Sequence, residues 1–535
     1  MWNHDYAPIA GSLGWSAVVA ALPIAALLFA LGVLRFSAWK SALIGLIASL
    51  LLALFAYHMP TDLALASAAD GAAFGLFPIA WIVYWAVALY RLTVDTGQFE
   101  IIKDSVGHLT DDQRIQALLI AFAFGAFIEG AAGFGTPVAV AAAMMTGLGF
   151  PPFRAAAICL LANTAPVAFG SIGTPLVTLA GVTGLPLAPL SAGVGRICAP
   201  VALFLPAYLV VVMGGRSALK AVWPAALVCG LCFAVMQFLV SNFVGPYLTD
   251  ILGSLVAMLG LVLLLSTWRP ADMPRRTARP QRPPAGVLIK AWMPYILLVI
   301  FVLAWGLDPV KQLLNKATII FPWPGLDGRI QRLPPVVAHA APYAAKYTFN
   351  ILSASGTSAL FATVGAAFAL GVSPRKFFVS LAGTTRVMAM PMLTIAMVLA
   401  IAFVMNYSGA TSTLGLAFVA TGAMFPFFSA LLGWLGVFLT GSDTAANALF
   451  GNLQVVTAHQ LGMSPALMAA SNSSGGVMGK MISLQNIAVA AAATGMAASD
   501  EAKLFRFTLR HSILLACVIG LIVVFYAYVV PAWSV

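Results

Sequence analysis

Residues 127–135 read FIEGAAGFG, a Gly-rich and polar stretch in the middle of an otherwise apolar run from 117 to 148. The stretch divides the run into two arms of about 12–15 residues, whereas a helix needs about 20 apolar residues to cross a bilayer. Two short arms that return to the same side form a re-entrant hairpin, and its tip must be buried in protein or line a wet cavity. The sequence therefore predicts such a hairpin at 117–148.

A second apolar run, 427–458, has the same organisation around the stretch GSDTAAN at 441–447. The residues before the two breaks align, AFIEGA at 126–131 with VFLTGS at 437–442. Downstream, NTAP at 163–166 aligns with NSSG at 472–475. These matches predict an internal repeat with one re-entrant hairpin in each copy.

The overall composition identifies a membrane protein. Hydrophobic residues make up 61% of the 535 residues and charged residues only 8%, whereas a soluble protein carries roughly 25% charged residues. A mean hydropathy of +0.99 indicates that lipid surrounds most of the chain. The net charge of +11 comes from basic residues in short connections between apolar runs, which excludes nucleic-acid binding as a primary role.

The fold class predicted is an all-α polytopic membrane protein with about 12 transmembrane helices plus the two re-entrant hairpins. The first span lacks a basic leader region, so we expect it to be retained as a helix. The predicted spans are 14–34, 41–58, 71–91, 155–184, 196–213, 221–241, 251–267, 291–307, 351–370, 386–404, 466–496 and 511–530. Two of them, 155–184 and 466–496, are too long for an ordinary span and are interrupted in their middles.

Positive charge predicts the orientation. The connection 268–290 holds six basic residues against one Asp, so it should be cytoplasmic, and its Pro- and Arg-rich part, 270–284, should be a linker. Counting spans from there places both termini outside and makes the two repeats inverted. The outside loop 308–350 is the exception, because it is also basic. We expect a first repeat at 1–215, connecting helices and the linker at 216–290, and a second repeat at 291–535.

Inverted repeats with paired broken helices are typical of secondary transporters whose substrate binds where the repeats meet. A helix broken inside the membrane leaves free N–H groups and a positive dipole end, which suit a carboxylate. Uncharged polar side chains and glycines near the breaks can complete such a site. The substrate-binding residues predicted on this basis are Asn163, Thr164, Asn472, Ser473, Ser474, Gly130, Gly441 and Ser442.

Three charged residues lie near the breaks. Glu129 and Asp443 sit at the tips of the first and second hairpin, and a carboxylate inside a membrane marks a proton or ion route. The alternative is that each caps the second arm of its hairpin. We expect one of the two to carry a proton. Lys480 follows Gly479 in the second broken helix and should balance the charge of the substrate or of Asp443, or else form a structural ion pair.

Enzyme motifs are absent, including a zinc-protease helix, a phosphate-binding loop and a serine nucleophile elbow. Two alternatives to a proton-coupled carrier stay open at this point. One is a sodium- or proton-coupled carrier of another small carboxylate, and the other is a membrane enzyme that acts on a lipid-linked acid. Cys229 and Cys232 form a C-x-x-C, but inside an apolar run they should be helix-packing residues.

The chain resembles the bacterial L-lactate permeases, the glycolate-transporting members included, over essentially its whole length. The resemblance is most specific in FPIAWI at 77–82, FIEGAAGFG at 127–135, NTAPVAFG at 163–170, GWLGVFLTGSD at 433–443 and GGVMGKMIS at 475–483. It implies an inner-membrane symporter of protons with L-lactate, D-lactate and glycolate, without a cofactor. Leu484 departs from the family pattern, where proline is expected, so the second break should rely on Gly475 and Gly476.

The paired Asn-Thr and Asn-Ser-Ser segments also look like the carboxylate-binding hairpin motifs of the ion-transporter superfamily, which implies a homodimer with an elevator-like moving domain. A 2-hydroxy acid has a pKa near that of Asp, so at pH 7 only about one molecule in a thousand is neutral and able to cross lipid unaided. If one anion crosses with one proton, the loaded carrier is electroneutral and accumulates its substrate about tenfold per unit of pH gradient.

Overall fold

The structure is a computed structural model that describes residues 1–107, 109–133, 135–272 and 284–533. Most of the predicted linker 270–284, and Phe134 of the first hairpin, lie outside the described residues. The described part of the membrane-embedded chain is helical, as the composition predicts.

The helices before the linker begin close to the predicted spans. Several of them follow a Ser, Pro or Asp, which are common residues before a helix. They are α1 (Leu13–Ala20), α2 (Leu22–Gly32), α3 (Ala38–Leu51), η1 (Leu52–Ala56), α4 (Thr61–Phe74), η2 (Gly75–Ala80), α5 (Trp81–Asp95), α6 (Gln98–Gly107), α7 (Gln113–Gln116), η3 (Ala117–Phe124), α8 (Gly125–Ala131), α9 (Thr136–Gly147), α10 (Pro152–Ala162), η4 (Val167–Phe169), α11 (Gly170–Thr183), α12 (Leu187–Phe243) and α13 (Thr249–Thr267).

The second half begins with α14 and includes four of the five strands. Its elements are α14 (Ala285–Gly306), α15 (Asp308–Asn315), β2 (Ile319–Pro322), β3 (Ile330–Arg332), β4 (Ala341–Pro342), β5 (Lys346–Phe349), α16 (Ser355–Ala369), α17 (Pro374–Ser408), α18 (Ala410–Phe418), η5 (Val419–Met424), α19 (Phe425–Thr440), α20 (Asp443–Gln460), α21 (Pro465–Gly479), η6 (Lys480–Ile482), α22 (Leu484–Thr494), α23 (Ala498–Tyr528) and η7 (Pro531–Trp533).

The number of spans is smaller than the twelve predicted. Among the described residues, ten helical stretches are long and apolar enough to cross a membrane, or eleven if the bent pair α10 and η4–α11 counts as one. Three predicted spans are lost as separate spans, whereas two of the ten stretches, Gln113–Ala131 and Ala410–Thr440, contain the first arms of the hairpins and were not among the twelve. Helix α16 has only 15 residues, the break in 466–496 leaves two short helices, and α12 contains the predicted spans 196–213 and 221–241 in one 57-residue stretch.

That long stretch is divided by its glycines. Gly214 and Gly215 have non-helical backbone angles, and Gly215 has a φ of 73°, which favours a residue without a Cβ. The two parts of α12 are therefore separate arms on either side of residues 214–222, close to where the sequence predicts a short connection.

Three of the four hairpin arms are longer than predicted, and only α9, with 12 residues, has the predicted length. The first arm of the first hairpin is continuous from Gln113 to Ala131, because the Asp112 side chain accepts a hydrogen bond from the Arg114 N–H and starts the helix among polar residues. The second hairpin has arms of 16 and 18 residues, α19 and α20. The breaks at the two hairpin tips lie where predicted. Hydropathy alone underestimates the length of a helix that begins in polar sequence. The span 113–131 is 94% buried, so protein surrounds the first hairpin.

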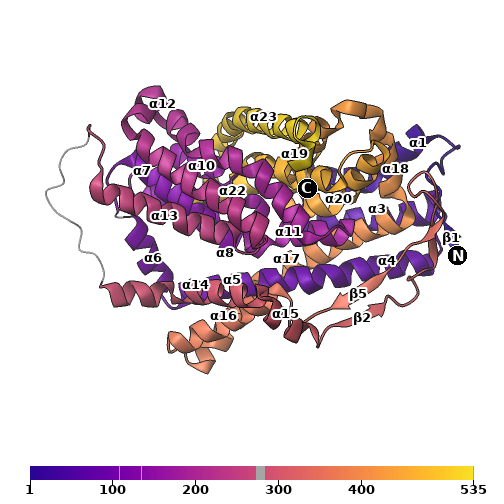
Figure 1. The fold of residues 1–535 in the computed structure, drawn as a ribbon, viewed down its shortest axis with the longest axis horizontal. Helices are drawn as coiled ribbons and strands as arrows, with labels where there is room; N and C mark the ends of the chain where they lie inside the picture. The colour runs from indigo at the N-terminus through magenta and orange to yellow at the C-terminus, as the bar shows by residue number, and fades with distance from the viewer. Residues whose placement is uncertain (108, 134, 273–283, 534–535) are drawn as a thin grey trace.

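The basic loop 308–350 is structured, which an all-α prediction misses. Strands β2 and β5 pair antiparallel, and β3 pairs with β4 and with the N-terminal strand β1 (Trp2–Asn3). Arg329 forms an ion pair with Asp62 of α4 at 2.7 Å. Figure 1 shows these strands and the N-terminus at one end of the molecule, with α6 and α7 at the opposite end.

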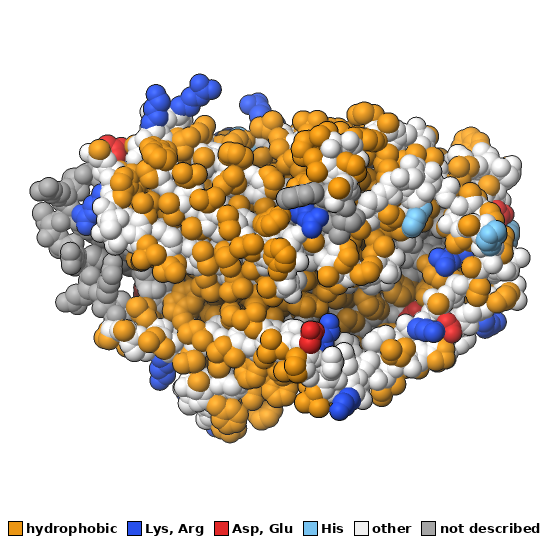
Figure 2. Space-filling model, viewed as in Figure 1, with side chains coloured by type: hydrophobic (Ala, Val, Ile, Leu, Met, Phe, Trp, Pro, Cys, Tyr) orange, Lys and Arg blue, Asp and Glu red, His pale blue; other side chains and the backbone are white. Residues whose placement is uncertain are grey.

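The outer surface suits a lipid environment. Figure 2 shows a face covered mostly by apolar side chains, with Lys and Arg found singly and largely toward the edges. Inside, the largest fully buried side chains include Phe122, Phe124, Phe127 and Phe169, which come from the first hairpin and the first broken helix. The core is therefore packed around the interrupted elements.

Candidate functional site

The hairpin tips are built from left-handed residues. In the first hairpin, Gly133 (φ +64°) and Gly135 (φ +79°) turn the chain between α8 and α9. In the second, Gly441 (φ +71°) ends α19, and the Ser442 hydroxyl accepts a hydrogen bond from the Ala445 N–H at 3.3 Å to start α20. Each tip thus exposes the N-terminus of the second arm at the break.

The first broken helix contains an unusual backbone segment. Helix α10 and the η4–α11 stretch meet at 64°. Ser171, Ile172 and Gly173 then have φ values of 46°, 55° and 70°. A β-branched Ile in the left-handed region is strained, and such strain concentrates at functional sites. Ser171 also donates a hydrogen bond to the Ala132 carbonyl at 2.9 Å, which ties this segment to the first hairpin tip.

The break in the second broken helix lies further along the chain than predicted. Helix α21 continues through Asn472, Ser473, Ser474, Gly475 and Gly476 to Gly479, and the break falls at η6 and Ser483. The prediction that Gly475 and Gly476 form the break is wrong. These glycines serve helix packing instead, since a Cβ on Gly475 would lie 1.9 Å from the Ala430 carbonyl oxygen of α19.

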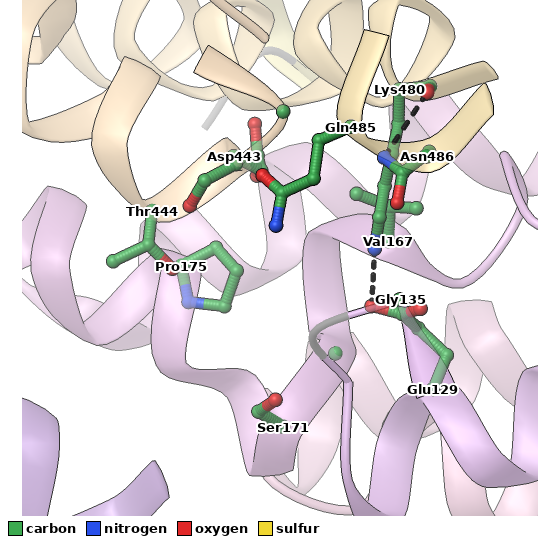
Figure 3. Close-up of a pocket in the computed structure, with 13 residues that line it drawn as sticks. Glu129, Gly135, Val167, Ser171, Pro175, Asp443, Thr444, Lys480, Gln485 and Asn486 are labelled. Carbon is green, nitrogen blue, oxygen red and sulfur yellow. Dashed lines mark hydrogen bonds and ion pairs between the residues drawn. The ribbon is translucent and has the colours of Figure 1, made fainter. Parts of the chain in front are cut away.

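The four breaks surround one pocket, which we call the central pocket. Its empty space is about 530 Å³, including the part open to solvent. The N-terminal ends of α9, α11, α20 and α22 all contribute to its wall, one hairpin arm and one half-helix from each predicted repeat. Figure 3 shows its lining: Glu129, Gly135, Val167, Gly170, Ser171, Pro175, Gly441, Ser442, Asp443, Thr444, Lys480, Gln485 and Asn486.

An ion pair bridges the two halves across this pocket. The Lys480 ammonium donates to the Glu129 Oε1 at 2.7 Å, and the two side chains are only 8% and 4% exposed (Figure 3). Gly170 leaves room for the pair, because a Cβ at that position would lie 2.6 Å from Glu129 Oε1. The Glu129 Oε2 has no hydrogen-bond partner among the described residues. The carboxylate is therefore held chiefly by Lys480.

Asp443 lies in a different environment, a hydrogen-bonded network of neutral groups. Its Oδ2 accepts from the Ser473 hydroxyl at 2.5 Å and from the Asn447 amide at 3.3 Å. Asn447 also donates to the Pro175 carbonyl of α11 at 3.1 Å, so the network joins the second hairpin to the first broken helix. The Asn472 amide donates to Asn447 and its carbonyl accepts from Gln454. Asn472 and Ser473 thus belong to the hydrogen-bond network that holds Asp443.

The predicted site residues divide into two groups. Glu129, Gly441, Ser442, Asp443 and Lys480 line the central pocket, whereas Gly130, Asn163, Thr164, Asn472, Ser473 and Ser474 are buried outside its wall.

The residues of the second group differ in their hydrogen bonds. Thr164 donates to the Leu161 carbonyl within its own helix end. Both amide atoms of Asn163 and the Ser474 hydroxyl lack a hydrogen-bond partner in the described residues.

Sequence reasoning missed eight pocket residues: Gly135, Val167, Gly170, Ser171, Pro175, Thr444, Gln485 and Asn486. Ser171 and Pro175 follow the first break within the stretch GSIGTP at 170–175, whose two glycines are the signal that could have marked it. Gln485 and Asn486 lie in the first turn of α22, whose N-cap is Ser483, so a search for caps after Lys480 would have found them. In the described part of the chain, no group of three His, Cys, Asp or Glu side chains could hold a metal ion.

Comparisons with known proteins agree with this architecture. The family model described as L-lactate permease matches residues 16–530. The chain is 47% identical to glycolate permease GlcA of Escherichia coli (strain K12), over 99% of this chain and 98% of the relative. It is 45% identical to an L-lactate permease of Bacillus subtilis (strain 168), over 100% of both. The solved structure of MtrF from Neisseria gonorrhoeae shares the fold, with a TM-score of 0.51, 12% identity and coverage of 94% and 97%.

Proposed function

Because the chain belongs to the L-lactate permease family, we propose that it carries L-lactate, D-lactate and glycolate together with protons into bacteria across the inner membrane. It is a multi-pass membrane transporter and not an enzyme. The observation that carries the proposal is the buried pair of Lys480 and Glu129 among four helix N-termini.

The central pocket has the chemistry of an anion site. Helix N-termini favour negative charge because their first N–H groups are unpaired and the helix dipole is positive there. Discontinuous helices use these ends to bind carboxylates in other secondary transporters. Lys480 adds a full positive charge that is only 8% exposed. A small carboxylate can therefore replace water in this pocket without being left unpaired.

The ion pair gives a simple coupling mechanism. A substrate carboxylate that binds Lys480 competes with Glu129 for the same ammonium group. Glu129, 4% exposed, then loses its partner, and a buried unpaired carboxylate is so costly that it takes up a proton. Binding one anion thus requires one proton, and the loaded carrier has the same net charge as the empty one. Release reverses both steps, since Lys480 returns to Glu129 and the proton leaves.

The rest of the wall suits a 2-hydroxy acid. Gln485 points into the pocket near Thr444 and Pro175 (Figure 3), and its side chain makes no hydrogen bond within the described residues. We assign the substrate hydroxyl to the Gln485 amide, because an amide can both donate to and accept from a hydroxyl. Val167 and Pro175 supply apolar surface for the methyl group of lactate, and glycolate leaves that space empty.

Other assignments complete the proposal. Asp443 is the second candidate for the proton, held by Ser473 and Asn447. The roles proposed for Asn163, Thr164, Asn472 and Ser474 are to contact the substrate in a state with rearranged hairpins. We also propose that the chain divides into a first repeat at 1–215, a connection at 216–290 and a second repeat at 291–535, and that the protein is a homodimer with an elevator-like moving domain.

The experiment is uptake of labelled lactate into sealed vesicles that contain the purified protein, with pH, sodium and electrical gradients imposed separately. We expect uptake to follow the pH gradient, with no sodium requirement and no uptake driven by membrane potential alone. Potential-driven uptake at equal pH would eliminate the electroneutral scheme. A strict sodium requirement would instead identify a sodium-coupled carrier.

The two proton candidates are separated by neutral variants. If Glu129 carries the proton, Glu129→Gln loses pH-driven accumulation and retains counterflow exchange, whereas Asp443→Asn keeps both. The reverse pattern assigns the proton to Asp443. Normal accumulation by both variants would show that neither carboxyl is the coupling site.

A further inference from the structure

A third carboxyl group lies beside the ion pair, and neither the sequence motifs nor the mechanism above uses it. Asp250 is in the first turn of α13 and is 1% exposed. Its helix packs against the first hairpin so closely that a Cβ on Gly130 would lie 2.8 Å from the Asp250 Cβ. Asp250 therefore packs against the residue that follows Glu129.

Asp250 is a buried carboxyl without a partner. Neither of its oxygens has a hydrogen-bond partner in the described residues. Among the described residues, Glu129 of α8 and Lys480 of η6 interact electrostatically with Asp250, and so does the Cys198 thiol of α12. The η3 segment that also packs on α13 contains no titratable residue.

This environment determines the charge of Asp250. An isolated carboxylate is far too costly to bury, so such a group takes up a proton unless a cation or several donors hold it. The nearby cation, Lys480, is already paired with Glu129 at 2.7 Å. Asp250 must therefore be the neutral acid while that pair is closed. Its place in the first turn of α13 also permits a transient negative charge, because the helix dipole favours an anion there.

We infer that Asp250 is the proton donor to Glu129: it holds a proton while Lys480 pairs with Glu129 and passes it to Glu129 when a substrate anion takes Lys480. This inference rests on the proton coupling proposed above. The O–H bond on Asp250 breaks and an O–H bond on Glu129 forms, while the electron pair stays on Asp250. The Asp250 carboxylate then regains a proton from water, so the net change is one proton taken up with one anion.

The first test measures the proton directly, without transport. Infrared difference spectra of the reconstituted protein without substrate at neutral pH should contain the C=O stretching band of a buried protonated acid. The band should be missing from Asp250→Asn and should change position when lactate is added to the wild type. A wild-type spectrum identical to that of Asp250→Asn would overturn the inference.

The second test separates Asp250 from the coupling itself. In Asp250→Asn, pH-driven net uptake should slow by about tenfold or more, the scale of a lost proton-transfer group. Counterflow exchange, in which Glu129 keeps its proton, should be retained, and this also shows that the variant is folded. The matched control is Asp70→Asn in α4, another buried carboxyl (4% exposed), which should behave as the wild type.

The outcomes are distinguishable from failure of the proposed function. If the wild type itself shows no pH-driven uptake, proton coupling is wrong. If the wild type is pH-driven and Asp250→Asn accumulates lactate at the same rate, the protein is a proton symporter but Asp250 is not its donor. Loss of both net uptake and exchange in a folded Asp250→Asn variant would assign Asp250 to substrate binding, against the inference.

Discussion

Lys480 and Glu129 are 351 residues apart in the sequence, and their side chains meet in a buried ion pair at 2.7 Å. One partner lies at the break of the second broken helix, in η6, and the other precedes the tip of the first hairpin. The contact thus joins two interrupted elements that come from opposite halves of the chain. A movement of either element relative to the other would change this contact.

Removing only one partner of the ion pair should destabilise the protein. Lys480→Met leaves Glu129 buried without its cation, which destabilises a protein by about 3–5 kcal/mol. The double variant Lys480→Met/Glu129→Gln removes the uncompensated charge and should recover most of that loss. Thermal unfolding in detergent measures both. Equal melting temperatures for the single and double variants would show that the pair contributes no coupling energy.

Helix packing at the second half depends on glycine. In Gly475→Ala the new methyl group would meet the Ala430 carbonyl oxygen of α19 at 1.9 Å, so α19 and α21 must separate. We expect a loss of stability of roughly 1–3 kcal/mol, the scale of an overpacked core. The control is Gly147→Ala in α9, where nothing lies within 4 Å of the added Cβ. Similar unfolding temperatures for the two variants would contradict this packing.

Gln485 should determine the preference for hydroxy acids. Gln485→Leu removes the amide assigned to the substrate hydroxyl, so the advantage of lactate over propionate, which lacks that hydroxyl, should fall by roughly tenfold. Competition of each acid against labelled lactate measures the ratio. An exposed glutamine away from the pocket, in Gln113→Leu, should keep the wild-type ratio. An unchanged ratio in Gln485→Leu would place the hydroxyl elsewhere.

The N-terminal segment should be sensitive to acid. Burial, assisted by the charge of Arg332, lowers the pKa of His4 from 6.5 to about 4, although its hydrogen bond to the Tyr407 carbonyl acts the other way. Between these two pH values the unfolded segment binds a proton that the folded segment does not. Attachment of the segment is therefore unaffected above pH 6.5 and weakens as the pH falls, by about 1.4 kcal/mol per unit.

Hydrogen exchange of residues 2–6 at pH 7.5 and pH 5, corrected for intrinsic rates, measures this effect. Protection should decrease at pH 5 in the wild type and should change less in His4→Gln, which keeps a polar side chain but cannot take up a proton. Equal protection of the wild type at both pH values would show that His4 is not buried in its neutral form.

The sequence alone determined the membrane class, the positions of the hairpin tips and three of the charged residues near the pocket. Breaks at Gly133–Gly135 and Gly441 are local events, because a glycine in the left-handed region ends a helix whatever surrounds it. Glu129, Asp443 and Lys480 were recognisable since charges are rare in apolar runs. The lengths of the hairpin arms were less predictable, because a cap such as Asp112 extends a helix into polar sequence.

Only the tertiary structure decided which of these residues meet. Lys480 could have paired with Asp443 on sequence grounds, yet it pairs with Glu129, and Asp443 is held by Ser473 and Asn447 instead. Asn472 lies inside α21 rather than at a break, because α21 packs on α19 over this stretch and stays helical to Gly479. Pairing and burial depend on elements hundreds of residues apart, and local sequence patterns contain no information about that distance.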